Sequence, residues 1–138
     1  MTRPDFLKRS STTIIILETS PYWEAELRRR IDDLDDRLII CRNLSEVRPS
    51  MKSTPDNIFI CSLSPLTGEL LLLLSEVQER RMSSGIIVVR KNVDAELDWN
   101  LREIGVTAVL PDRYESAMEI ERYCRILAKS PTSSRPVR

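Results

Sequence analysis

Five short aliphatic runs are the feature of this sequence that most constrains its fold. Each run is four or five residues long, and none alternates cleanly between apolar and polar residues. A half-exposed strand alternates, whereas a strand buried on both faces reads as a continuous apolar run, as in a parallel sheet. The predicted strands are residues 14–17, 38–41, 58–61, 86–89 and 106–110.

The segments between these runs carry helix signals. Ser20-Pro21 and Ser64-Pro65 each offer a capping residue followed by proline at the first helical position. Behind each start, apolar residues recur at helical spacing, so we expect one face of each helix to pack on the sheet. These positions are Trp23, Leu27, Ile31 and Leu34 in the first helix, and Leu66, Leu70, Leu73, Leu74 and Val77 in the next.

The later helices have clearer ends, and one intervening segment is weak. Asp94 can cap a short helix that Gly105 closes. Asp112 with Glu115 has the spacing of a capping box, which predicts a final helix starting at Asp112. After the second strand, Pro49 limits the chain to a turn or two of helix.

The order of elements is therefore strand then helix, five times. Such alternation predicts right-handed crossovers and a parallel sheet covered by helices on both faces. For five strands the common solution is a flavodoxin-like α/β/α sandwich with strand order 2-1-3-4-5. We expect one domain over residues 12–129, with polar, flexible tails at 1–11 and 130–138.

Composition excludes several functional classes. The chain of 138 residues contains no histidine and only three glycines. Histidine-dependent nucleophiles and histidine-ligated zinc are impossible within it, and too few glycines remain for a dinucleotide-binding loop. The net charge of zero conceals a value of −5 over residues 12–128, because the ends are basic. That acidic balance disfavours nucleic acid, and acidic neighbours flank the basic run 28–30.

Cysteine usage and hydropathy indicate a compartment. Cys41, Cys61 and Cys124 match no metal-binding spacing, and an odd number argues against a disulfide framework. They are expected to be buried free thiols in a reducing cytoplasm. The first eleven residues do not resemble a signal peptide, and the longest apolar run, Leu70–Leu74, is far too short to cross a membrane.

Three stretches resemble the receiver domains of two-component response regulators. TPDNIFICSLSPLTGELLLLL at 54–74 resembles the third strand and following helix of that family. LETSP at 17–21 resembles the segment that normally carries an acidic pair, and GVTAVLPD at 105–112 resembles the fifth strand. The resemblance covers about residues 12–129 and implies a receiver-like fold.

The resemblance also implies a phosphorylation pocket that has lost most of its chemistry. Active receivers use two acids that bind Mg²⁺, a phosphoacceptor aspartate, a hydroxyl residue and a lysine. The corresponding residues here are Glu18 and Thr19, Cys61, Arg90 and Leu110. Only Glu18 keeps the expected chemistry, because a thiol does not replace the carboxylate and leucine cannot contact a phosphoryl oxygen. We therefore expect a degenerate receiver with no metal and no cofactor.

Two hypotheses concern the vacated pocket. If Cys61 faced it, Arg90 at the neighbouring strand end could favour the thiolate, although a buried strand cysteine is the more common outcome. Glu18 and Arg90 could instead pair across the pocket. A flavin or nucleotide is disfavoured because the hydroxyl residues at the strand ends have no glycine near them.

Several apolar residues fall off the predicted core faces and suggest an interaction surface. These are Leu72, Trp99, Met118 and Ile126. By resemblance, Trp99 and Met118 lie near the face formed by the fourth helix, fifth strand and fifth helix, which receivers use for dimerisation and output. The sequence thus predicts a non-enzymatic, stand-alone signalling or adaptor module that binds a protein partner or itself. The alternatives are a divergent phosphoacceptor regulator and a small flavodoxin-like ligand-binding protein or enzyme.

Overall fold

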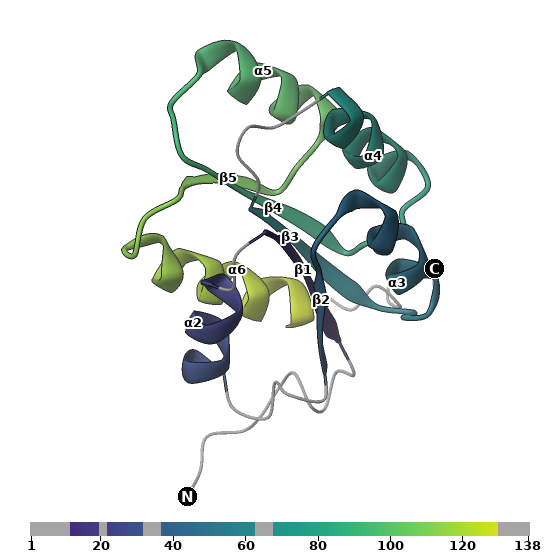
Figure 1. Cartoon of the computed structure of the whole chain (residues 1–138), viewed down its shortest axis with the longest axis vertical. Coiled ribbons are helices and arrows are strands. Elements are labelled where there is room, and N and C mark those ends of the chain that lie inside the picture. Colours follow the sequence, from purple (N-terminus) through teal and green to yellow (C-terminus); the bar gives the residue numbers. More distant parts are fainter. Residues whose placement is uncertain (1–11, 20–21, 32–36, 63–67, 130–138) are drawn as a thin grey trace, which may run out of the picture.

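A computed structural model describes residues 12–19, 22–31, 37–62 and 68–129. Its centre is one five-stranded parallel sheet with the order β2-β1-β3-β4-β5, so the predicted flavodoxin-like topology is confirmed (Figure 1). The strands are β1 (Thr13–Glu18), β2 (Leu38–Cys41), β3 (Asn57–Ser62), β4 (Gly85–Arg90) and β5 (Ala108–Pro111). The predicted tails, 1–11 and 130–138, lie outside the described residues.

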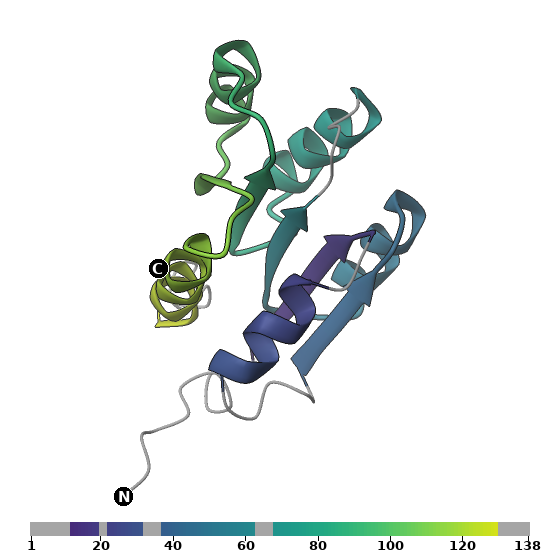
Figure 2. The same cartoon turned by 60° about the vertical axis from the view of Figure 1, so that its left-hand side comes forward.

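Helices cover both faces of the sheet, as Figures 1 and 2 show. Helices α2 and α6 pack on one face, and α3, α4 and α5 pack on the other. The helical elements are α2 (Trp23–Arg30), the 3₁₀ turn η2 (Leu44–Glu46), α3 (Val47–Lys52), α4 (Gly68–Glu79), α5 (Ala95–Ile104) and α6 (Ser116–Lys129). This arrangement is the three-layer sandwich expected from the alternation of strands and helices.

The central strand β1 shows why the aliphatic runs do not alternate. Ile14 and Ile16 face the α2 and α6 layer, whereas Ile15 and Leu17 face the α3, α4 and α5 layer. All four side chains are fully buried. Burying such a side chain contributes roughly 1.5–3 kcal/mol, and here both sides of the strand gain it. The sheet can therefore form only with a helical layer on each face.

The fifth strand is shorter than predicted. It begins at Ala108, because Val106 closes the end of α5 by donating its N–H to the Leu101 carbonyl oxygen at 3.2 Å. Thr107 then donates to the carbonyl oxygen of Ile86 at 2.8 Å, and this bond aligns the new strand with β4. The apolar character of Val106 serves packing against the helices rather than strand pairing.

The predicted ends of α5 are confirmed. The Asp94 carboxylate accepts from the backbone N–H groups of Glu96 and Leu97, each at 3.1 Å. Gly105 follows the last turn with a φ of 100°, a left-handed conformation that glycine adopts without a steric penalty. Pro49 also fits, because it lies in the first turn of α3, where its missing N–H would have no helical acceptor.

The prediction that a capping box formed by Asp112 and Glu115 starts α6 is wrong. The helix begins at Ser116, whose hydroxyl donates to the carbonyl oxygen of Pro111 at 2.6 Å. The Asp112 carboxylate instead accepts from the indole N–H of Trp23 at 3.2 Å. The Asp112 side chain, which the local spacing predicted to cap α6, therefore bonds to a residue of a distant element instead. The other predicted starts, Ser20-Pro21 and Ser64-Pro65, and the core positions Leu34 and Leu66 lie outside the described ranges.

Candidate functional site

The carboxyl edge of the sheet brings together the residues predicted to form the degenerate pocket. Glu18 ends β1 and pairs in register with Ser62 at the end of β3. Arg90 ends β4 and pairs in register with Pro111 at the end of β5. Parallel strands place all these ends at one edge, which is where open α/β sheets usually bind ligands. The proximity predicted from the sequence is therefore present.

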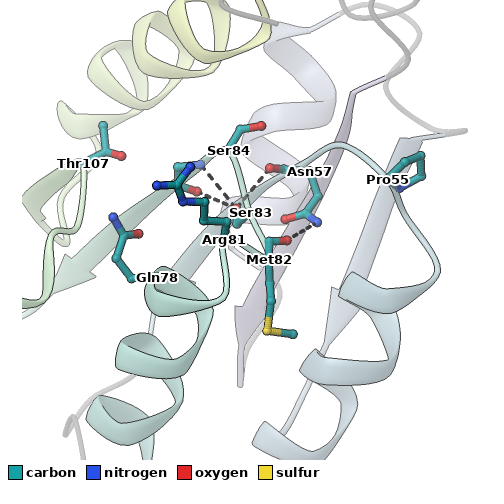
Figure 3. A pocket seen from close by; sticks show the side chains of 9 residues that line it. Pro55, Asn57, Gln78, Arg81, Met82, Ser83, Ser84 and Thr107 are labelled. Carbon is teal, nitrogen blue, oxygen red and sulfur yellow. Dashed lines mark hydrogen bonds between the residues drawn. The ribbon is translucent and has the colours of Figure 1, made fainter. Parts of the chain in front are cut away.

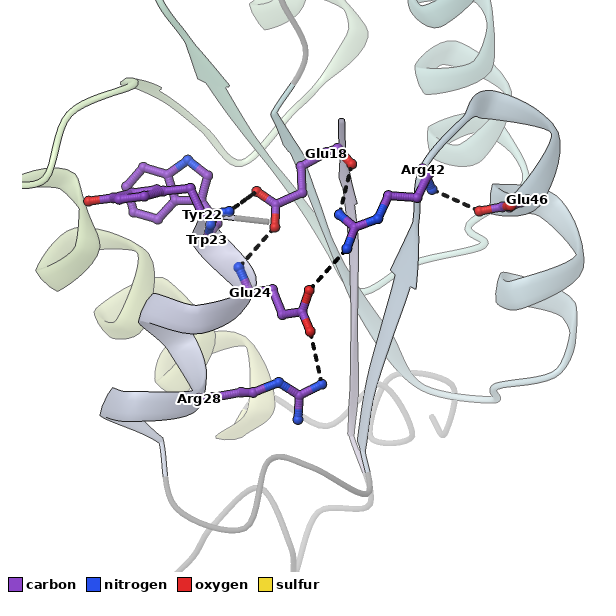
Figure 4. Close-up of polar contacts among 7 residues, drawn as sticks. All are labelled: Glu18, Tyr22, Trp23, Glu24, Arg28, Arg42 and Glu46. Atoms are coloured by element: carbon purple, nitrogen blue, oxygen red, sulfur yellow. Dashed lines mark hydrogen bonds and ion pairs between the residues drawn. The ribbon is translucent and has the colours of Figure 1, made fainter. Parts of the chain in front are cut away.

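Both oxygens of the Glu18 carboxylate accept hydrogen bonds from backbone N–H groups at the start of α2. One oxygen, Oε1, accepts from the N–H of Trp23 at 3.0 Å and from that of Tyr22 at 3.3 Å. The other, Oε2, accepts from the N–H of Glu24 at 2.9 Å (Figure 4). Glu18 is only 2% exposed, and Tyr22, at the capping position, makes no side-chain capping bond. Glu18 thus acts as a helix cap supplied by the preceding strand.

Arg42, directly after β2, fixes the surroundings of this carboxylate. Its guanidinium donates to the backbone carbonyl oxygen of Glu18 and to the Glu24 carboxylate, both at 3.2 Å (Figure 4). Arg28 donates to the other oxygen of Glu24, also at 3.2 Å. The sequence analysis missed Arg42, although a basic residue at the end of a strand next to an acidic strand end is a usable signal. The cluster ties β1, β2 and α2 together.

Cys61 does not face the pocket. Its side chain is fully buried in the apolar cluster between the sheet and the layer of α3, α4 and α5. Burial raises the pKa of the Cys61 thiol to about 12, so the thiolate is scarce near neutral pH. Cys41 and Cys124 are also buried free thiols, as predicted. The reactive-thiol hypothesis for Cys61 therefore loses its physical basis.

Arg90 pairs with Asp98 rather than with Glu18, so the predicted ion pair across the pocket is wrong. The Arg90 guanidinium contacts both carboxylate oxygens of Asp98, through Nε at 2.8 Å and Nη2 at 2.9 Å. The hydrogen bond from Arg90 lowers the pKa of Asp98, and the same bond raises the pKa of Arg90. This two-pronged contact attaches α5 to the end of β4.

The remaining two pocket positions contribute no reactive group. Leu110 is half-buried and packs against the apolar cluster on the α2 and α6 face. Thr19 follows Glu18 and is exposed. Within the ranges that the structure describes, no group of three acidic or cysteine side chains is placed to hold a metal ion. The five positions share an edge of the sheet but do not converge on a common point.

The predicted interaction residues are all on the surface. Leu72 on α4, Trp99 on α5, and Met118 and Ile126 on α6 are between 49% and 72% exposed. The structure adds three exposed large apolar side chains that the sequence analysis did not select, namely Tyr22, Val93 and Tyr114. Val93 and Tyr114 lie in loops, where the helical spacing used to find the others gives no signal.

Comparisons with known proteins assign no family to this chain. No protein-family model matches it, and no curated protein sequence matches it at a significant level. None of the helices in the described ranges combines the length and hydropathy that a membrane span requires. Inferences about function therefore rest on the fold, on the contacts just described and on the resemblance in the sequence.

Proposed function

We propose that this chain is a receiver-like module that acts through protein association, without aspartyl phosphorylation. The observation that carries this proposal is the state of Glu18, whose two carboxylate oxygens already accept three backbone N–H groups of α2. An acid that binds a catalytic cation must offer its lone pairs to the metal. The one residue with retained receiver chemistry thus serves a structural purpose.

The neighbouring positions support the same proposal. Phosphoryl transfer needs a nucleophile exposed to the phosphodonor, whereas Cys61 lies inside an apolar cluster with a raised pKa. A cation near the acceptor would stabilise the charge of the phosphoryl group, but the Arg90 guanidinium is held by Asp98. The groups that would bind the cation, accept the phosphoryl group and stabilise its charge are thus each engaged elsewhere or buried. This favours a module that has no phosphorylation step.

The association surface that we propose comprises α5, β5 and α6. Both views of the fold place β5 between these two helices at one side of the sheet (Figures 1 and 2). Trp99 on α5 is 52% exposed and Met118 on α6 is 67% exposed. Tryptophan is enriched among the residues that dominate binding energy at protein interfaces. The occupant in this proposal is a protein partner or a second copy of the chain.

A phosphorylation assay tests the first half of the proposal. The purified chain is incubated with acetyl phosphate and Mg²⁺ beside an active receiver domain as a positive control. We expect no change in intact mass, whereas the control gains about 80 Da, the mass of a phosphoryl group. A stoichiometric adduct on this chain would contradict the proposal and favour the divergent phosphoacceptor instead.

Matched surface variants test the second half. Trp99→Ala and Met118→Ala should weaken self-association, measured by light scattering after gel filtration, or capture of a partner from the native host. Leu72→Ala is the control, because it removes an exposed apolar side chain on α4, which is not part of this surface. If Trp99→Ala and Met118→Ala both behave like the wild type in both assays, this surface is not the one used.

A further inference from the structure

Helix α5, which carries Trp99, has few apolar attachments to the sheet. Of its ten residues only Leu101 is buried, whereas the neighbouring helix α4 buries four side chains. Leu97 and Ile104 are half-buried against the same apolar cluster as Leu101. A helix with so few buried apolar contacts is less firmly held than the rest of a domain. Polar contacts therefore have a large share in fixing the position of α5.

The far end of α5 is attached through the backbone. The N–H of Gly105 donates to the carbonyl oxygen of Leu101 at 3.1 Å and closes the last turn. Thr107 follows at the amino edge of the sheet, where Figure 3 shows it in the lining of a polar pocket. Its N–H donates to the carbonyl oxygen of Ile86 at 2.8 Å, and its hydroxyl accepts from the N–H of Ile86 at 3.2 Å. These two bonds hold the end of α5 against the start of β4.

The near end of α5 is attached through the ion pair between Arg90 and Asp98. Residues 91–94, which connect β4 to α5, are all exposed, so this loop does not itself hold the helix in place. In the part of the chain that the structure describes, no other side-chain hydrogen bond joins α5 to a different element. The Arg90 and Asp98 side chains are 12% and 23% exposed. The two-pronged contact is thus partly shielded from water, and its geometry fixes orientation as well as distance.

Arg90 also contacts the segment that leads into α6. Its carbonyl oxygen accepts from the N–H of Asp112 at 2.8 Å. The Asp112 carboxylate in turn accepts from the indole N–H of the buried residue Trp23. Ser116, the first residue of α6, donates its hydroxyl hydrogen to the carbonyl oxygen of Pro111. Arg90, at the end of β4, therefore connects to both helices of the association surface, to α5 through its side chain and to α6 through its backbone.

Asp98 and Trp99 are consecutive residues, so the ion pair acts next to the exposed indole. With about 1.5 Å of rise per residue, Trp99 lies about 9 Å along the helix axis from Gly105. If the near end of α5 is released while the far end stays attached, a tilt of about 10° moves Trp99 by roughly 1.5 Å. The cores of protein interfaces are packed as densely as protein interiors, so a displacement of this size weakens binding.

We propose that Arg90 is the positioning residue of the association surface. Its guanidinium holds α5, and with it Trp99, in the orientation that the occupant of this surface recognises. Its carbonyl oxygen, through Asp112, keeps the approach to α6 in a fixed relation to α5. This inference rests on the proposed function, because the task exists only if that surface is used. The attachment of α5 is nevertheless a property of the isolated chain, and it is measured without a partner.

Residual dipolar couplings of the ¹⁵N-labelled full chain measure the orientation of α5 relative to the sheet. Asp98→Asn removes the charge and one acceptor oxygen from the ion pair, and we expect α5 to reorient by about 10° or more while α4 and α6 keep their wild-type couplings. Asp98→Glu keeps a carboxylate within reach of Arg90 and should restore most of the wild-type orientation. Glu76→Gln is the matched control, because it removes the charge from a second arginine–carboxylate contact, that of Arg48 with Glu76 between α3 and α4, and should leave α5 unchanged. Wild-type couplings throughout α5 in the Asp98→Asn protein would overturn the proposal.

Association measured on the same variants tests the task of Arg90 at the surface. Arg90→Lys keeps the charge but loses the two-pronged geometry, so this variant and Asp98→Asn should weaken association by about fivefold or more. Asp98→Glu and Glu76→Gln should remain close to the wild type. If a variant reorients α5 and still associates like the wild type, Arg90 has no positioning role. If Trp99→Ala leaves association unchanged although Asp98→Asn reorients α5, the proposed surface is wrong, and the role of Arg90 there is refuted with it while the attachment of α5 stands.

Discussion

The helix cap supplied by Glu18 makes a prediction whose sign separates a structural carboxylate from a functional one. Glu18→Ala leaves the N–H groups of Trp23 and Glu24, now bonded at 3.0 and 2.9 Å, without their acceptor. Loss of a cap costs about 0.5–2 kcal/mol, and a hydrogen bond to a charged group contributes about 1.5–3 kcal/mol. Because the site is buried and water does not readily replace the carboxylate, we expect a loss of about 2–4 kcal/mol.

If Glu18 were instead retained to bind a metal or a substrate, we would expect its replacement to leave the free energy of unfolding unchanged or to raise it. Functional groups are often retained at a cost in stability, so their removal is neutral or stabilising. Glu18→Gln refines the test, because it keeps one acceptor oxygen and removes the negative charge from the helix start. We expect it to lose about 1–2 kcal/mol, less than alanine does.

Urea denaturation followed by circular dichroism measures these differences. With a slope of about 2 kcal/mol per molar urea, typical of a small protein, Glu18→Ala should lower the midpoint by roughly 1–2 M. The matched control is Glu24→Gln, which removes a carboxylate whose ion-pair partners among the described residues are the side chains of Arg28 and Arg42. That change should cost about 0.5 kcal/mol or less. A Glu18→Ala protein as stable as the wild type would refute the capping argument.

Three further predictions follow from contacts in the structure. Asp98→Asn should cost about 1 kcal/mol at neutral pH. Because Arg90 lowers the pKa of Asp98, this stabilisation is present above about pH 4 and is lost as pH falls below it, so wild type and variant should converge in acid unfolding curves. Cys61 should react with iodoacetamide far more slowly than free cysteine until the protein is unfolded, as judged by peptide mass spectrometry; rapid native labelling would contradict its burial. At Arg81, whose φ is 51°, valine should destabilise by about 1–2 kcal/mol in thermal unfolding, whereas glycine should change stability by less than about 1 kcal/mol; equal effects would contradict the left-handed backbone.

The strand positions and the presence of a helical layer on each face were predictable, because a strand that is covered on both faces is apolar at every position. The run around Ile15 is continuous because both of its faces are covered, and this property is visible without coordinates. The ends of α5 were equally predictable, since Asp94 and Gly105 act on backbone groups within a few residues. The error at β5 arose because Val106 is apolar for packing on the helices, and hydrophobicity alone does not distinguish that from strand pairing.

The candidate site was predictable only in its location. Topology places Glu18 and Arg90 at one edge of the sheet, and the sequence indicated both. Their hydrogen-bond partners were not predictable, because the sequence offers each of these side chains several possible partners. These are side chains of opposite charge and backbone N–H groups at helix starts. Glu18 bonds to the start of α2, and Arg90 bonds to Asp98 on α5, so neither is left for the other.

The sequence by itself therefore determined the fold class and the strand order. These follow from hydrophobic burial, which is non-directional and is encoded by residue type and spacing. Only the tertiary structure decided that Glu18 is a helix cap and that Arg90 bonds to Asp98. Hydrogen bonds and ion pairs depend on distance and angle within a few tenths of an ångström, and that geometry exists only once distant segments are packed together.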